Sequence, residues 1–200
     1  MNNIIFVTGN KHKLEIAQAV LSMYNIEVNN IDLGVDEIQE TNIEIIAAKS
    51  AIAAAKELHM PVIKTDVGFE FEALNGFPGA FGRYVFKQLG TEGILKLLED
   101  KENRRAKSIE VLAYAEPNGK YKTFRMDTGL IIRKTPKGTG SVMDQIMEIK
   151  GQKANYGSLS LEEKLDWWRK NDNYFHNFAK WYIERDKKGE DINLEKNNVR

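Results

Sequence analysis

The chain has 200 residues, of which 42% are hydrophobic, so it is long enough to form one globular domain with a substantial core. Lys and Arg number 29 and Asp and Glu also number 29, and this zero net charge excludes the broad basic surface of a protein that grips nucleic acid. The absence of cysteine excludes disulfides and thiolate metal sites. No apolar run is long enough for a signal peptide or a membrane span, which predicts a cytoplasmic protein without a membrane partner.

The first expected elements are a strand, a turn and a helix. Residues 4–7 form a β-branched and aromatic run typical of a strand, and Thr8-Gly9-Asn10 follow as a turn in which Asn10 is the candidate N-cap. Apolar residues recur at helical spacing over residues 13–24, and the next strand is expected over residues 26–33. A glycine-containing turn therefore leads directly into a helix.

The middle of the chain predicts a second helix and a further strand. Thr41-Asn42-Ile43-Glu44 has the pattern of a capping box, and the stripe of small and apolar residues that follows is typical of a helix. Residues 61–63 begin another strand, and a glycine-rich turn follows at residues 75–79.

The remaining elements complete a mixed α/β pattern. We expect a helix over residues 92–98, strands over 108–115 and 121–133 joined by a turn at 117–119, and an aromatic-rich helix over 161–183. Residues 188–200 are polar and lack periodicity, so we expect a disordered tail after a single domain over residues 1–187. The order of elements predicts an α/β fold with a mixed sheet and flanking helices.

The first turn predicts an anion site. The first N–H groups of a helix are unpaired and the helix dipole is positive there, so acidic side chains are favoured and lysines are not. Lys11 and Lys13 would instead pair with a multiply charged group such as a triphosphate. The alternative is that both are solvated surface residues, which is the usual explanation for an isolated lysine pair.

Three further residues carry charge near the expected ends of elements. Asp66 lies at the carboxyl end of a strand, where open α/β sheets place their ligands, and Glu37 precedes the second helix. Lys49 flanks the apolar stripe of that helix. Carboxylates near phosphate-binding lysines favour Mg²⁺. The ordinary alternatives are a solvated loop carboxylate for Glu37 and a lysine that extends from the helix into solvent for Lys49.

Several motifs resemble those of the inosine triphosphate pyrophosphatase family, also called the non-canonical purine NTP pyrophosphatases. They are VTGN followed by Lys13, PVIKTDVGFEFEALNGFPGAFGRYV and LGTEGILKLLED, within residues 4–100. The resemblance implies an elongated protein with two lobes around a central nucleotide-binding cleft, and a homodimer. It also implies Mg²⁺-dependent hydrolysis of nucleoside triphosphates to monophosphate and pyrophosphate, which clears deaminated purines from the nucleotide pool.

The resemblance assigns roles to individual residues. It implies triphosphate contacts from the turn and the two helices: Thr8, Gly9, Asn10, Lys13 and Lys49. Glu37 and Asp66 are implied to hold the metal, with Asp66 also activating the attacking water. Thr65 stands where relatives carry the first acid of an acidic pair, so one carboxylate is missing. Gly68 and Arg83 fall at further substrate-binding positions.

The carboxyl-terminal half departs from the family pattern. Asp144 is retained without its aromatic and proline neighbours, and Lys164 is kept. The Ser-His-Arg positions, where the His and Arg read the 6-oxo group of the purine, are occupied by Trp168-Arg169-Lys170. Trp168 and Arg169 are therefore candidates for contact with the base, and His176 is a possible substitute reader. The alternatives are an aromatic core stripe and a packed helix histidine. The departure predicts altered or broadened base specificity.

Two other functions compete with the predicted Mg²⁺-dependent pyrophosphatase. A nucleotide-binding sensor that retains the cleft is favoured by Thr65, whereas the retained acids and lysines favour the enzyme. A nucleic-acid-binding protein would depend on Arg104, Arg105 and Lys107. That cluster is small and the chain is neutral, so no nucleic-acid polymer is expected as a partner.

Overall fold

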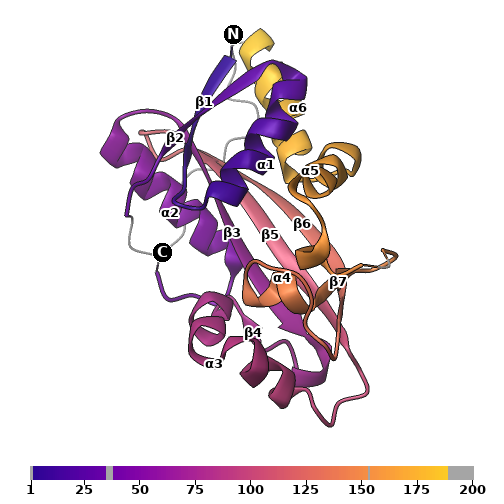
Figure 1. Cartoon of the computed structure of the whole chain (residues 1–200). Coiled ribbons are helices and arrows are strands. Elements are labelled where there is room, and N and C mark those ends of the chain that lie inside the picture. The colour runs from indigo at the N-terminus through magenta and orange to yellow at the C-terminus, as the bar shows by residue number, and fades with distance from the viewer. Residues whose placement is uncertain (1, 35–37, 153, 189–200) are drawn as a thin grey trace. The chain divides into compact units, whose positions relative to one another are not determined.

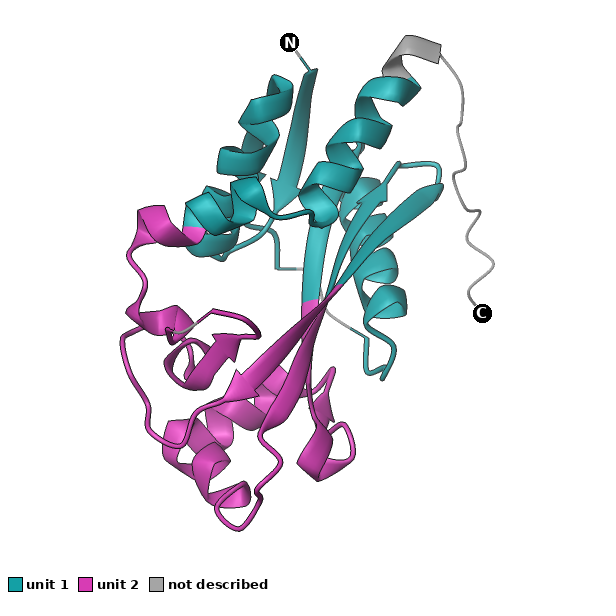
Figure 2. Cartoon of the chain, turned by 90° about the vertical axis from the view of Figure 1, so that its right-hand side faces the viewer, with its two compact units in different colours: residues 1–66, 110–126, 165–200 teal, residues 67–109, 127–164 magenta. Residues whose placement is uncertain are grey.

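The computed structural model describes residues 2–34, 38–152 and 154–188. Its backbone forms two compact units (Figure 2): unit 1 comprises residues 1–66, 110–126 and 165–200, and unit 2 comprises residues 67–109 and 127–164. Three strands contribute residues to both units: β3 (Val62–Phe71), β5 (Arg105–Ala115) and β6 (Tyr121–Ile132). No helix of the described residues is long and apolar enough to cross a membrane.

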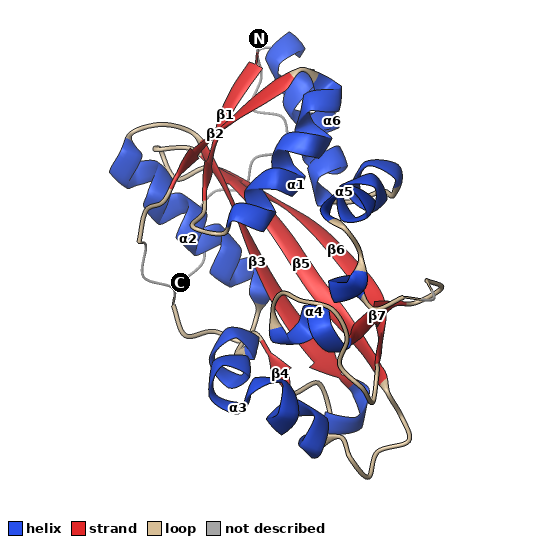
Figure 3. Ribbon diagram, in the orientation of Figure 1, coloured by secondary structure: helices blue, strands red, loops and turns tan. Residues whose placement is uncertain are grey.

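The strands form one mixed sheet (Figures 1 and 3). Within the described residues the order is β2-β1-β3-β5-β6-β7, and β4 pairs with β3. The other strands are β1 (Asn2–Val7), β2 (Ile26–Ile31), β4 (Pro78–Gly79) and β7 (Met147–Ile149). β1 is parallel to both β2 and β3, whereas β4 and β7 are antiparallel to their neighbours. The predicted mixed α/β class is confirmed.

The first helix, α1 (Lys11–Leu21), follows β1 after a short turn. Asn10 has extended backbone angles, and its side-chain oxygen accepts a hydrogen bond from the Lys13 N–H at 3.2 Å. The predicted N-cap is therefore confirmed. The predicted helix over residues 13–24 ends as an α-helix at Leu21 and continues as the 3₁₀ turn Ser22–Tyr24.

The second helix, α2 (Ile43–Leu58), begins one residue later than the capping-box pattern indicates. Asn42 is the N-cap, and its side-chain oxygen accepts from two N–H groups of the first turn, at 2.9 and 3.4 Å. The predicted box between Thr41 and Glu44 is wrong, because Asn caps a helix at least as well as Thr. The Glu44 carboxylate instead accepts from the Thr123 hydroxyl at 3.1 Å.

The helix predicted over residues 92–98 is the last part of a longer helix. α3 begins at Gly82 and ends at Leu97, and Gly90 (φ 61°, ψ −173°) interrupts its helical backbone. Gly82 and Gly93 also lie within the helix. These glycines lower helical propensity, which is why the sequence pattern did not show the first half.

The aromatic-rich stretch predicted as one helix forms two. α5 (Leu161–Lys170) and α6 (Tyr174–Lys188) are separated by residues 171–173. Asn173 starts α6, because its side-chain oxygen accepts from the Phe175 N–H at 2.9 Å. α6 includes Lys188, which was assigned to the tail, and the rest of the tail lies outside the described residues.

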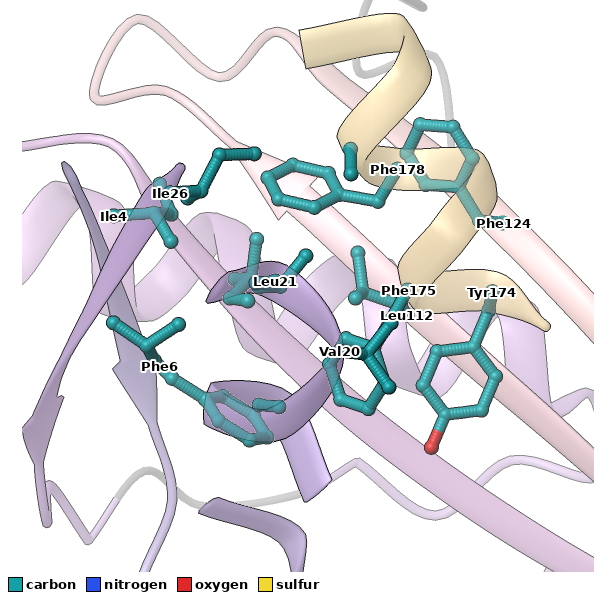
Figure 4. Close-up of a cluster of buried hydrophobic side chains, with 14 of the residues drawn as sticks. Ile4, Phe6, Val20, Leu21, Ile26, Leu112, Phe124, Tyr174, Phe175 and Phe178 are labelled. Carbon is teal, nitrogen blue, oxygen red and sulfur yellow. The ribbon is translucent and has the colours of Figure 1, made fainter. Parts of the chain in front are cut away.

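The core of unit 1 is aromatic and holds α1 and α6 against the strands (Figure 4). Phe6 of β1 and Phe175 of α6 are almost fully buried and meet edge to face, with ring centroids 6.2 Å apart. Burying such a side chain contributes roughly 1.5–3 kcal/mol. α2 covers the other face of these strands (Figures 1 and 2). The start of α1 is therefore fixed beside the carboxyl end of β1.

The core of unit 2 is smaller and lies on one face of its part of the sheet. It contains Phe71, Leu130 and Ile132 of the strands, together with Ile94 of α3 and Ile146 of α4 (Val142–Ile146). Phe71 lies between Glu70 and Glu72, and the buried Ala106 lies between Arg105 and Lys107, as expected for a sheet with one face toward water.

Candidate functional site

The turn between β1 and α1 is held by hydrogen bonds on both sides. The Thr8 N–H donates to the Ile31 carbonyl at 3.1 Å, and the Asn10 N–H donates to Thr8 Oγ1 at 3.1 Å. Gly9 and Asn10 are exposed. The side-chain oxygen of Asn10 is used as the cap. The amide NH₂ of the same side chain is a donor, and it is the group that would contact an anion. The predicted phosphate turn is thus held by hydrogen bonds and exposed to solvent.

A carboxylate lies directly against this turn. A Cβ added to Gly9 would be only 2.8 Å from Asp32 Oδ1, so a side chain at position 9 would force Asp32 to move. Val7 pairs with Ile31 in the parallel β1–β2 ladder, and the residues that follow these strands therefore meet. Sequence reasoning did not single out Asp32. The expected strand over residues 26–33 includes Asp32, whereas the observed β2 ends at Ile31, so Asp32 follows the strand.

Lys13 connects the turn to the middle of β3. This strand continues beyond Asp66 to Phe71, so the prediction that Asp66 lies at the carboxyl end of a strand is wrong. The side-chain Nζ of Lys13 donates to the main-chain carbonyl of Thr65 at 3.3 Å, and Lys13 is half-buried. Asp66, the residue after Thr65, is also half-buried. The structure therefore brings the predicted phosphate turn and the Lys13 side chain to the backbone of Thr65, one residue before Asp66. We call Thr8, Gly9, Asn10 and Lys13 the cradle.

Thr65 and Asp66 do not present their side chains to the same side. Successive side chains of a strand alternate between the two faces of the sheet, and both residues lie within β3. The side chains at the two positions that the family resemblance describes as an acidic pair therefore lie on opposite faces of the strand.

Lys49, the next predicted phosphate ligand, lies within α2. Glu40 accepts from the Thr41 N–H, and this hydrogen bond is the main reason that the pKa of its carboxyl is lowered. The positive charge of Lys49 makes a smaller contribution to the lowered pKa of Glu40. Glu37, the other predicted metal ligand, lies outside the described residues.

Four predicted substrate-binding residues belong to unit 2. Gly68 is buried on β3, and Arg83 is exposed in the first turn of α3. Asp144 closes a capping box at the start of α4, where its carboxylate accepts from the Ser141 N–H at 2.8 Å. The Lys164 ammonium lies 4.8 Å from the centre of the Tyr156 ring. Asp144 and Lys164 therefore each have a structural partner, and their contacts with substrate stay predictions.

The candidate base-reading residues of unit 1 are mostly packed inside. Trp168 is 5% exposed and contacts Tyr174 edge to face at 5.5 Å, which is the core role named as the alternative. Arg169 is half-buried at the end of α5.

His176 is the packed histidine of the two alternatives. It is 7% exposed, and its Nε2 lies 3.3 Å from the Trp168 carbonyl and 3.1 Å from the Arg169 carbonyl. Because carbonyls only accept, Nε2 carries the proton in the neutral ring, and Nδ1 accepts from the Tyr24 hydroxyl at 2.9 Å. His176 thus caps the end of α5 and ties it to the turn after α1.

A Mg²⁺ ion at this site would need ligands from a triphosphate in addition to side chains of the described residues. Within residues 2–34, 38–152 and 154–188, no three His, Cys, Asp or Glu side chains lie close enough to hold a metal by themselves. Asp66, the residue after Thr65, carries a hard carboxylate, and Mg²⁺ commonly uses one or two carboxylates together with substrate phosphates.

A separate cavity of about 550 Å³ lies on the charged face of unit 2. Its charged residues pair across strands, with Glu72 to Arg105 at 2.8 Å and Glu70 to Lys107 at 3.0 Å. The Arg105 guanidinium lowers the pKa of Glu72. No predicted triphosphate contact lines the cavity, and its pairs neutralise one another. We therefore place the candidate site at the cradle.

Comparison with known proteins identifies the family. Residues 4–170 match the model of the Ham1 family. The chain belongs to the Ham1 family. A dITP/XTP pyrophosphatase of Methanopyrus kandleri is 41% identical over 180 residues, which cover 90% of this chain and 95% of that protein. An inosine triphosphate pyrophosphatase of Candida glabrata is 33% identical and is aligned over 80% of this chain and 88% of its own length. The resemblance read from the motifs is confirmed, and the names of these relatives agree with the predicted class of enzyme.

Solved Ham1 structures share the fold. A HAM1 protein from Coxiella burnetii superposes with a TM-score of 0.75 at 23% identity. The match covers 92% of this chain and 100% of the Coxiella chain. The Staphylococcus aureus Ham1 protein gives a TM-score of 0.69 at 25% identity, with 94% of this chain and 99% of that chain covered. Ham1 proteins thus share the mixed sheet with flanking helices described above.

Proposed function

We propose that this Ham1 protein is a Mg²⁺-dependent nucleoside triphosphate pyrophosphatase, which yields a nucleoside monophosphate and pyrophosphate. The observation that carries the proposal is the contact between Lys13 Nζ and the Thr65 carbonyl at 3.3 Å. It holds a helix start and a lysine, which suit phosphates, at the residue that precedes Asp66, a carboxylate that suits a metal or a water. The relatives named dITP/XTP pyrophosphatases support the reaction.

The residues of the cradle would bind and orient the triphosphate. The N–H groups at the start of α1 and the Asn10 amide would hold phosphate oxygens, and Lys13 and Lys49 would neutralise charge that develops on the leaving pyrophosphate. When bound, Mg²⁺ would supply further charge neutralisation at the phosphates, with Asp66 and Glu37 as its proposed ligands.

Asp66 would also position the attacking water. The water oxygen forms a bond to the α-phosphorus, the bond from the α-phosphorus to the bridging oxygen breaks, and pyrophosphate leaves with that oxygen. Asp66 accepts or orients the proton that the water loses, as a general base in this step.

We propose that the enzyme has altered or broadened base specificity. A pocket rejects a wrong base strongly when its buried polar groups would be left unpaired. His176 and Trp168, two of the candidate readers, are engaged in packing and capping. Arg169 and Lys170 then remain near the end of α5, and charge alone discriminates poorly among bases.

A homodimer in the cytoplasm is the proposed setting, in which the enzyme acts on the free nucleotide pool. The competing function is a weakly catalytic nucleotide sensor, which the Thr65 substitution favours.

One screen tests the proposed function. Purified protein is incubated with ITP, XTP, dITP, GTP and ATP, with Mg²⁺ or with EDTA, and pyrophosphate and phosphate are measured separately. We expect pyrophosphate to appear only with Mg²⁺. Tight binding without turnover for every nucleotide would favour the sensor and contradict the enzyme.

A further inference from the structure

The hydroxyl of Thr65 has no role in the function proposed above. Thr65 Oγ1 is buried, and it makes no hydrogen bond to any part of the chain that the structure describes. A buried hydroxyl without a partner destabilises a protein, so native structures keep few of them. The group is therefore expected to meet a partner that is not part of the chain.

The Thr65 hydroxyl lies on the same side of the sheet as the cradle. Ile63 pairs with Phe6 in the parallel β1–β3 ladder, and both side chains belong to the core under α1. Because strand side chains alternate, Thr65 shares the face of Ile63. Thr8 likewise lies two positions after Phe6. Thr8 and Thr65 therefore lie beyond the same pair of core residues in the two parallel strands.

The surroundings of Thr65 suit an anionic oxygen. Its own carbonyl holds the Lys13 ammonium at 3.3 Å, so a positive charge is fixed at this residue. A hydroxyl can donate a hydrogen bond, whereas an ionised acid at this position could only accept one. Hydrogen bonds to a charged oxygen are stronger than those between neutral groups. Threonine thus replaces a group suited to a metal with one suited to a phosphate.

We propose that Thr65 Oγ1 donates a hydrogen bond to a phosphate oxygen of the bound nucleoside triphosphate, beside Lys13. Thr65 is then a substrate-binding residue of this chain at a position where the family resemblance implies an acid. The inference rests on the proposed function in one respect: it takes a triphosphate as the ligand of the cradle.

Calorimetric binding of the α,β-methylene analogue of ITP tests the inference, because this probe cannot be cut between the α and β phosphorus. Binding is measured with Mg²⁺ and in EDTA. Thr65→Val keeps the shape and removes the hydroxyl, and it should raise the Kd about tenfold in both conditions. Thr65→Ser keeps the hydroxyl and should bind close to the wild type.

Thermal unfolding separates a binding role from a structural one. Thr65→Val removes a buried group that has no partner in the chain, so its Tm should equal or exceed that of the wild type. A lower Tm together with an unchanged Kd would overturn the inference.

Ser50→Ala is the matched control. Ser50 is 5% exposed on α2, and its hydroxyl is also buried without a hydrogen bond in the described residues. This variant should bind the analogue as the wild type does, and an equal loss of affinity would overturn the inference.

Turnover of ITP by the wild type distinguishes failure of the inference from failure of the proposed function. If the wild type releases pyrophosphate while Thr65→Val binds normally, only the inference fails. If binding depends on the hydroxyl but nothing is hydrolysed, only the enzyme proposal fails.

Discussion

The side-chain ammonium of Lys13 donates to the main-chain carbonyl of Thr65 at 3.3 Å, although 52 positions separate the two residues in the chain. This contact holds the first turn of α1 against the middle of β3, within unit 1. A main-chain carbonyl carries no full charge, so this hydrogen bond does not neutralise the ammonium.

Replacing Lys13 should therefore weaken catalysis more than it weakens the fold. Lys13→Met removes the charge beside the predicted phosphates, and kcat/KM for ITP should fall about a hundredfold. The control is Lys56→Met, which removes an exposed lysine from the last turn of α2. Equal activities of the two variants would show that the lysine of α1 does not contact the substrate.

Asp66 is the second test of the proposed site. Asp66→Asn keeps the size of the side chain and removes its charge, so turnover should fall about a hundredfold or more while Tm changes little. Asp100→Asn changes an exposed acid in the turn after α3 and should have wild-type kinetics. Full activity of Asp66→Asn would rule out the proposed metal and water site.

Base specificity follows from the missing His-Arg pair. We expect kcat/KM values for ITP, GTP, ATP and dUTP that differ by less than about a hundredfold, or that favour a base other than hypoxanthine. Steady-state kinetics with the four nucleotides checks this. A preference for ITP over ATP and GTP on the order of a hundredfold or more would mean that Arg169 or another residue rebuilds the lost contact.

His176 should matter for stability and not for base choice. His176→Phe leaves the Tyr24 hydroxyl and two carbonyls at the end of α5 without their partner, and it should lower the free energy of unfolding by roughly 1–3 kcal/mol. Tyr24→Phe should cost about 1 kcal/mol. Because both changes break the same hydrogen bond, the double variant should lose less than the sum.

Denaturant unfolding of the four proteins gives this cycle, and ITP and ATP kinetics of His176→Phe complete the test. The ratio of kcat/KM for ITP to that for ATP should stay at the wild-type value. A changed ratio of kcat/KM in a stably folded variant would mean that His176 does contribute to recognition of the base.

Local signals made the amino-terminal half of the fold predictable from sequence. Asn10 caps α1 as predicted, because a cap depends on residues within one helical turn. The same kind of signal placed the start of α2 one residue early, since Thr41 and Asn42 are both good caps and the pattern does not choose between them. The glycines of α3 concealed where that helix begins. Asn173 starts a new helix inside the stretch that the sequence predicts as one helix.

The parts of the site that depend on strand pairing were not predictable. Asp32 lies against Gly9 only because β1 and β2 pair with Val7 opposite Ile31. The buried hydroxyl of Thr65 likewise depends on which face of β3 turns toward α1. The proposed roles of Lys13 and Asp66 come from resemblance to a family. The structure adds the contact between Lys13 and the Thr65 carbonyl, one residue before Asp66.

The central claim is that water attacks the α-phosphorus of a nucleoside triphosphate held by the cradle. Hydrolysis of ITP in water enriched in oxygen-18, followed by mass spectrometry of both products, tests it directly. We predict equal amounts of IMP and pyrophosphate, with the label in the IMP phosphate. Label in the pyrophosphate, or stepwise release of phosphate with accumulation of IDP, would contradict the claim.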